Sequence, residues 1–286
     1  MLKQLRQRLQ ALQKPAGIED GAGVLPLGIA AIDEALGGGL ARGALHEIAA
    51  ASEAHLAAAT GLALGLAALP RTNNTVIPGR PPKPEGRRRT NPESIIPAAE
   101  YGFRVRGLTP ASRNDGENAE RGEGIVWLAE DMALSESGAP YGPGLDAFGL
   151  APERLLTVCA ARPRDLLWAM EEALRCRVVG AVIGEWRHGV IDMVALRRLS
   201  LAAAESGALA LLLRASPADD ASPAATRWIV GAAPHDCLAA QLVRNRRGPV
   251  SSWILEWSDS DERFLLATHA QPVAAPALDR PHRKVA

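Results

Sequence analysis

The stretch GIAAIDEALGGGLARGALHEI, residues 28–48, sets the pattern of the chain. It predicts a short helix over 28–36, ended by three consecutive glycines, and then a strand over 44–49. An Ala- and Leu-rich helix is predicted next, over 54–69, and its composition favours a buried core position. A strand that passes through a short turn into a helix is the repeating unit of α/β folds.

Predicted strands and helices continue to alternate along the chain. Further strands are predicted over 125–128, 155–159, 178–183 and 209–213, with a short helix near Leu145 and longer helices over 163–175 and 191–205. The run VVGAVI at 178–183 is continuously apolar, which is typical of a strand buried on both faces. Strands over 227–231, 237–243 and 252–257 should close the fold as an antiparallel set. The order predicts an α/β fold with a mostly parallel sheet flanked by helices.

Composition divides the chain into segments. We predict an amphipathic N-terminal helix over 1–14, a linker over 15–27, a main domain over 28–258, and a C-terminal segment over 259–286 with a disordered tail. The main domain is interrupted by 71–123, which is rich in Pro, Arg and Asn. Its few apolar residues cannot offset the entropy lost on ordering, so we expect a disordered insertion.

The overall composition excludes several classes of protein. The 286 residues include 32 Lys or Arg and 32 Asp or Glu, a balance that argues against binding nucleic acid through bulk positive charge. The three cysteines are far apart and the six histidines lack metal-ligand spacing, so neither a disulfide framework nor a metal site is predicted. No apolar run is long enough to cross a membrane, and the cysteine usage fits a reducing compartment. We therefore expect a cytoplasmic protein that does not bind membranes.

The glycines and acids of the opening stretch carry a family resemblance. The spacing of Ile32-Asp33, Gly38-Gly39-Leu40, Gly43 and Glu47-Ile48 resembles the opening of RecA-like domains. In that family the strand with the Glu-Ile pair runs into a phosphate-binding loop, GxxxxGK[ST], and then into a helix. The resemblance implies a RecA-like core for the α/β fold.

The phosphate-binding loop itself is degenerate. Ala50 and His55 occupy its two glycine positions, Leu56 the lysine position, and Ala57 the position of the Ser or Thr that holds Mg²⁺. Converging backbone N–H groups, the lysine and the hydroxyl are what such a loop uses to hold phosphates. We predict no bound nucleotide or other cofactor, and a protein that is not an enzyme.

Other acidic residues match the RecA pattern only in part. Glu53 adds a negative charge where phosphate would lie. Glu130 resembles the water-activating carboxylate, although a structural role at a strand end is the favoured interpretation. Glu185 lies one position away from where RecA-like domains have the Asp that binds Mg²⁺. Asp219 and Asp220 follow the strand at 209–213, and because acids repel phosphate we expect any DNA contact to be weak or indirect.

A narrower resemblance covers about 25–70 and 124–258. It is carried by four segments: PLGIAAIDEALGGGLARGALHEI, VWLAEDMALSESGAPYGPGLDAFGL, RRLSLAAAESGALALLLR, and TRWIVGAAP with LVRNRRGPVSSWILEW. These resemble the ImuA family, which is related to the SulA cell-division inhibitors. The resemblance implies a non-enzymatic accessory protein of SOS mutagenesis and translesion synthesis. Its implied partners are an ImuB-like inactive Y-family polymerase and an error-prone polymerase α subunit, with RecA as a further candidate.

Two groups of residues are candidates for the partner interface. Leu2, Leu5, Leu9 and Leu12 share one face of the predicted N-terminal helix, which either packs on its own domain or docks a partner. Arg244 and Arg246 resemble a recombinase segment that faces the neighbouring subunit, and a solvated strand end is the alternative. Two other functions stay open: a SulA-like division inhibitor and a divergent ATP-dependent recombinase.

Overall fold

A computed structural model describes residues 23–69, 96–98, 103–106, 124–176 and 178–267. Within these residues, eleven strands form one sheet. In order across the sheet they are β13 (Arg263–Leu266), β12 (Ser251–Ser258), β11 (Cys237–Asn245), β10 (Thr226–Ala233), β3 (Leu45–Ala50), β9 (Leu209–Arg214), β8 (Val179–Trp186), β6 (Gly124–Glu130), β7 (Leu155–Ala160), β5 (Phe103–Arg106) and β4 (Ile96–Ala98). Strands β1 (Val24–Leu25) and β2 (Leu40–Ala41) pair separately.

The centre of the large sheet is parallel and both flanks are antiparallel. Six neighbouring strands, from β10 to β7 in the sheet order, run parallel. Strands β11, β12 and β13 extend one side in antiparallel pairing, and β5 and β4 extend the other. This arrangement confirms the predicted α/β fold with a mostly parallel sheet. Strand β10 differs from its prediction in one respect, because it pairs with β3 in parallel and with β11 in antiparallel.

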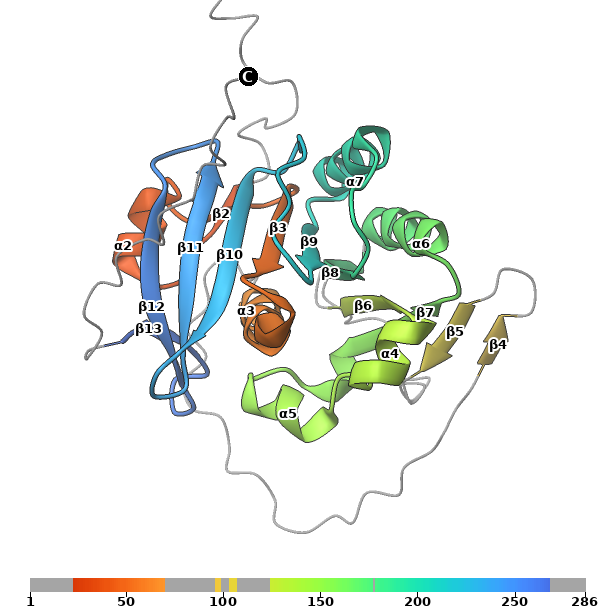
Figure 1. Cartoon of the computed structure of the whole chain (residues 1–286), viewed down its shortest axis with the longest axis horizontal. Helices are drawn as coiled ribbons and strands as arrows, with labels where there is room; N and C mark the ends of the chain where they lie inside the picture. The colour runs from red at the N-terminus through yellow and green to blue at the C-terminus, as the bar shows by residue number, and fades with distance from the viewer. Residues whose placement is uncertain (1–22, 70–95, 99–102, 107–123, 177, 268–286) are drawn as a thin grey trace, which may run out of the picture.

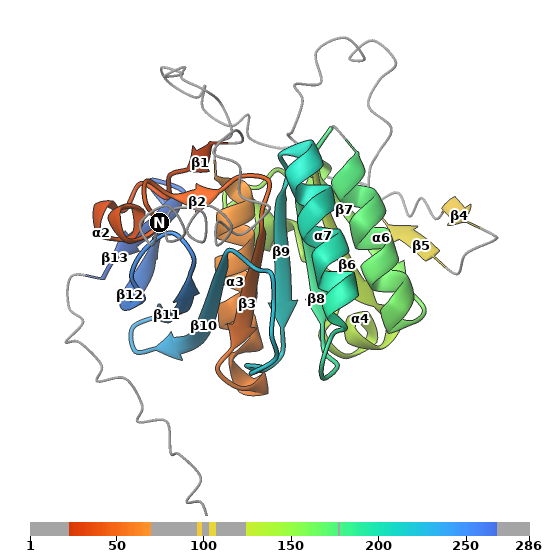
Figure 2. The ribbon, with the colours of Figure 1, turned by 90° about the horizontal axis from the view of Figure 1, so that it is seen from above.

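Helices cover both faces of the sheet. They are α2 (Ala30–Ala35), α3 (Leu56–Ala68), α4 (Asp131–Ser137), α5 (Gly142–Ala147), α6 (Pro163–Arg175) and α7 (Met193–Ser206). Figure 1 shows α6 and α7 on one face and α3, α4 and α5 on the other. The side-by-side packing of α6 and α7 is also clear in Figure 2. None of the helices in the described part of the chain is long and apolar enough to cross a membrane.

Alternation along the strands supplies a separate core to each face. On β6, Ile125 and Trp127 point into the core that contains α3, whereas Val126 and Leu128 point into the core beneath α6 and α7. Helix α3 is buried along nearly its whole length, as expected for a helix without a polar face. Its predicted core position is confirmed.

Several elements were not predicted from the sequence. Strands β4 and β5 lie inside the 71–123 insertion, and β5 pairs with β7, so the prediction of disorder was wrong for these residues. The insertion as a whole has the composition of a disordered segment, whereas a strand of a few residues needs only an open sheet edge to pair with. Strand β1 lies in the predicted linker over 15–27. Helix α4 follows β6 directly, and no helix was predicted from the sequence over 131–137.

Candidate functional site

The segment at the phosphate-loop position folds as a tight turn. Strand β3 ends at Ala50, and a 3-10 turn over Glu53–His55 leads directly into α3. Non-glycine residues with positive φ in the described part of the chain are confined to positions 235, 236 and 262, so the turn contains none. The backbone therefore avoids the strain that left-handed conformations would impose on Ala50 and His55.

Hydrogen bonds fasten this turn to the neighbouring strand. The imidazole Nδ1 of His55 accepts a hydrogen bond from the N–H of Ala232 at 3.0 Å. The N–H of Ala51 donates to the carbonyl of Val230 at 2.7 Å, and the N–H of His55 donates to the carbonyl of Ser52 at 2.9 Å. Two of the turn's N–H groups are thus bonded to protein carbonyls instead of facing a ligand. His55, which replaces a loop glycine, holds the turn against β10.

A cavity of about 520 Å³ lies beside the turn, along α3 and under α4 and α5. Its charged lining residues are Glu53, Glu136, Glu185 and Arg187. The Arg187 guanidinium donates to Glu185 at 2.7 Å and to Glu136 at 3.1 Å, and it also donates to the Ser137 hydroxyl at 2.6 Å. Among the described residues that line the cavity, the one cation is held by two carboxylates, so these residues leave no unpaired positive charge for a phosphate.

The two carboxylates compared with RecA chemistry each lie close to a nitrogen of a neighbouring side chain. Glu130, at the end of β6, lies 2.7 Å from Nε2 of the half-exposed His188. Glu185, on β8, pairs with Arg187 at 2.7 Å. The structure therefore places both acids at the carboxyl end of the parallel sheet, in contact with cationic or titratable side chains.

A buried group of charges, which the sequence argument did not find, links three central strands. Glu47 of β3 accepts from the Arg227 guanidinium at 2.8 Å and lies 3.8 Å from Arg214, and it also accepts a hydrogen bond from the Ser222 hydroxyl. Asp220 pairs with Arg227 at 3.1 Å and with Arg214 at 3.4 Å. We call Glu47, Arg214, Asp220 and Arg227 the buried charge cluster.

The buried charge cluster fixes the connection between β9 and β10. Arg214 ends β9, Arg227 lies near the start of β10, and Asp220 and Ser222 belong to the loop between them. Asp220 pairs with two guanidinium groups, whereas Asp219 is the exposed acid of this loop. The signal available in the sequence was the presence of charged residues within otherwise apolar strands.

His46, the neighbour of Glu47 on β3, is fully buried with both ring nitrogens bonded. Nε2 lies 2.9 Å from the carbonyl of Ala41, and Nδ1 lies 2.7 Å from the Thr226 hydroxyl, which also accepts from the Trp228 indole at 2.9 Å. Burial lowers the pKa of His46 to about 4, partly opposed by the hydrogen bond to Ala41. The imidazole is therefore a neutral structural group at neutral pH.

Of the predicted interface residues, the structure places the two arginines. Arg244 donates to the carbonyl of Ser222 at 2.8 Å, so it also secures the β9–β10 loop. Arg246 is half-buried, and burial together with the charge of Arg244 lowers the pKa of its guanidinium. Leu2, Leu5, Leu9 and Leu12 lie outside the described residues. The structure does not bring Arg244 into the turn at 50–57.

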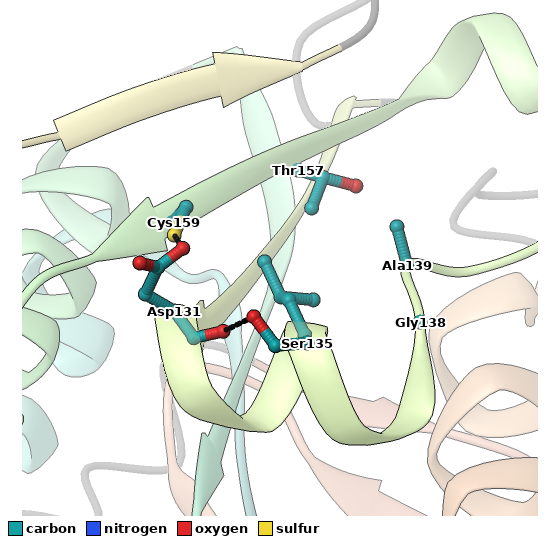
Figure 3. A pocket seen from close by; sticks show the side chains of 7 residues that line it. Asp131, Ser135, Gly138, Ala139, Thr157 and Cys159 are labelled. Atoms are coloured by element: carbon teal, nitrogen blue, oxygen red, sulfur yellow. Dashed lines mark hydrogen bonds between the residues drawn. The ribbon is translucent and has the colours of Figure 1, made fainter.

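A smaller cavity, of about 250 Å³, lies between α4 and β7 (Figure 3). The Cys159 thiol donates to the Asp131 carboxylate at 3.4 Å, and the Ser135 hydroxyl donates to the Asp131 carbonyl at 2.8 Å. Its lining residues include no histidine that could activate the thiol or the hydroxyl.

The sheet order, the helices on both faces and the strand–turn–helix unit at 45–68 define a RecA-like α/β domain. The crystal structure of the RadB recombinase superimposes with a TM-score of 0.50 over 82% of this chain and 97% of that chain, at 13% identity. The sequence is 28% identical to Protein ImuA of Caulobacter vibrioides (strain NA1000 / CB15N) over 181 residues, 56% of this chain and 67% of that protein. Protein ImuA of strain ATCC 19089 / CIP 103742 / CB 15 matches to the same extent. No protein-family model matches the chain.

Proposed function

We propose that this chain is a non-enzymatic RecA-like accessory protein in DNA-damage-induced mutagenesis and translesion synthesis. The likeness to Protein ImuA and the RecA-like fold support this role. The observation that carries the non-enzymatic part is the turn at 50–57. It has neither glycine, lysine nor hydroxyl at the phosphate-loop positions, and its backbone bonds to β10.

Nucleotide titration tests the non-enzymatic part. A ligand at a hundredfold excess over its Kd stabilises a protein by about 2.7 kcal/mol, which a thermal melt readily detects. We expect Mg-ATP at millimolar concentration to leave Tm unchanged, and a fluorescent ATP analogue to show no saturable binding to the full chain. A saturable signal that unlabelled ATP competes away would contradict the proposal and favour a divergent recombinase.

The proposed partners are an ImuB-like protein, an error-prone polymerase α subunit and RecA. We expect the tagged protein to co-purify with the first two after DNA damage to its host. Recovery of the division tubulin alone would instead favour a SulA-like inhibitor, and recovery of RecA alone would favour a modulator of recombinase filaments. Because the chain has no net charge, we propose that DNA is contacted weakly or through these partners.

The apolar face of the N-terminal segment is the proposed dock. Replacing Leu5 and Leu9 by Asp puts two charges on that face, so co-purification should be lost while the melting transition is kept. The matched control replaces Gln7 and Gln10 by Asp, which adds the same charge on the opposite side of a helix. If the leucine variant still recovers the partners, this segment is not the dock.

A further inference from the structure

The cavity beside α3 has the size and walls of a ligand site. Its volume of about 520 Å³ falls within the range of roughly 300–1,000 Å³ that is usual for binding pockets. Its apolar walls come from α3, β6 and α5 and include Leu64, Trp127, Leu145 and Phe148. The cavity extends well beyond the turn at 50–57, along the flank of α3.

One wall residue has an unsatisfied hydrogen-bond donor. Trp127 is 3% exposed, and among the described residues its indole N–H has no acceptor. Three other indoles, those of Trp186, Trp228 and Trp257, each donate to a nearby oxygen at 2.9–3.0 Å. A buried donor without an acceptor is unfavourable, and a bound carbonyl oxygen would satisfy it.

The charged lining of the cavity is acidic. Glu136 and Glu185 share the Arg187 guanidinium, which leaves Glu53 as the carboxylate with no ion pair within the described part of the chain. Glu53 is exposed, and it lies in the turn that leads into α3. Tyr141, 73% exposed, provides an aromatic ring in the lining that a cation can contact.

We propose that this cavity receives a short segment of a protein partner, in which an apolar side chain is adjacent to a lysine or arginine. The apolar side chain would pack between Leu145 and Phe148, the cation would pair with Glu53, and a backbone carbonyl would accept from the Trp127 indole. A nucleotide fits less well, because its phosphates would meet three carboxylates and one arginine already held by two of them. This inference rests on the proposed accessory function, since it assigns a partner-binding site to the protein.

The test selects peptides from a random nine-residue display library on the purified full-length chain. We expect the selected peptides to be enriched in Lys or Arg next to an apolar residue. Failure to select any peptide, or enrichment without basic residues, overturns the proposal. Peptides that match residues 1–14 of this chain would identify its own N-terminal segment as the occupant and would also overturn it.

Three variants show whether the selected peptides use the cavity. Glu53→Lys should weaken binding at least tenfold, whereas Glu34→Lys, the same change at an exposed position on α2, should not. Ala57→Trp fills the cavity from an exposed helix position and should abolish binding. Trp127→Phe removes the donor and should weaken binding, and because phenyl is smaller than indole in this buried position it should also lower Tm.

Equal peptide affinity across these variants and the unmodified chain would overturn the proposal. The outcome of the peptide selection does not depend on the proposed cellular role, because the selection uses purified protein. Peptide binding through the cavity without recovery of translesion partners would contradict only the cellular role. Partner recovery that is insensitive to Glu53→Lys and Ala57→Trp, with no selected peptide, would contradict only the cavity proposal.

Discussion

Gly65 of α3 lies where the helix meets the aromatic ring of Phe264. A Cβ at this position would overlap that ring, although alanine is ordinarily preferred to glycine inside a helix by roughly 1 kcal/mol. We expect Gly65→Ala to lower the free energy of unfolding by about 1–3 kcal/mol, as overpacked cores do. Urea denaturation measures the change.

Gly61, one turn earlier on the same helix, is the matched control. A Cβ there would lie 3.5 Å from the Phe148 ring, which is an ordinary contact. Gly61→Ala should therefore raise the free energy of unfolding by about 0.5–1 kcal/mol. Equal effects at the two positions would show that Phe264 does not restrict the helix.

The buried imidazole of His46 makes stability depend on pH. Its pKa is about 4 in the folded protein and 6.5 when unperturbed. Below pH 6.5 the unfolded chain takes up a proton that the folded protein does not, so stability falls by about 1.4 kcal/mol per pH unit until pH approaches 4. Above pH 6.5 this contribution is fully present. Denaturation of His46→Gln between pH 7 and 4.5 should show a shallower pH dependence, and an unchanged slope would disprove this assignment.

At the residue scale, the features that depend only on residues nearby in the chain could be predicted from the sequence. The four changed positions of the phosphate loop follow from spacing alone, and the structure shows a tight turn there. The bonding of His46 could not be predicted, because its partner Thr226 is 180 positions away and only the sheet order brings them together. The lack of an acceptor for the Trp127 indole N–H could not be predicted either, because the sheet order also decides which groups surround that indole.

At the element scale, the β9–β10 connection depends on buried ion pairs. Arg227→Leu leaves Glu47 and Asp220 with one fewer guanidinium in a buried site, which should lower the free energy of unfolding by about 3–5 kcal/mol. The exposed Arg197 gives the control, since Arg197→Leu should change stability by about 0.5 kcal/mol or less. Limited proteolysis should also cleave the loop over 215–225 faster in Arg227→Leu. An equally resistant loop in both variants would show that the pairs do not hold it.

Periodicity identified elements well where the side chains are apolar and regularly spaced. The helix predicted over 163–175 coincides with α6, and the run at 178–183 lies within β8 except for its first residue. Helix α4 was missed because its sequence DMALSES is short, polar and followed by a Gly/Pro-rich stretch. Strands β4 and β5 were missed because pairing with a distant edge, and not composition, makes them strands.

At the scale of the whole molecule, one sheet separates two apolar cores. Leu62 of α3 belongs to one core and Leu166 of α6 to the other, and both are almost fully buried. Leu→Ala at either position should cost about 2–5 kcal/mol. Because the central strands contribute side chains to both cores, each variant should shift a single thermal transition. Calorimetry that resolves two transitions, with each variant moving only one, would show that the faces unfold independently.

The alternation of strands and helices was sufficient to predict the mostly parallel sheet. The order of its strands was not predicted, because no local pattern states that β3 lies between β9 and β10. That order determines which charges meet in the interior and where the cavity beside α3 forms. Of the candidate site, the turn at 50–57 could therefore be predicted from the sequence, whereas the buried charge cluster and the cavity beside α3 could not.

The buried charge cluster has a consequence for how sequences of this kind can diverge. Two carboxylates and two guanidiniums balance one another in the interior, so losing one partner leaves an uncompensated charge. Substitutions at positions 47, 214, 220 and 227 should therefore be inherited together. Among homologous chains we expect either the full charged set or an apolar replacement of all four, with mixed combinations rare.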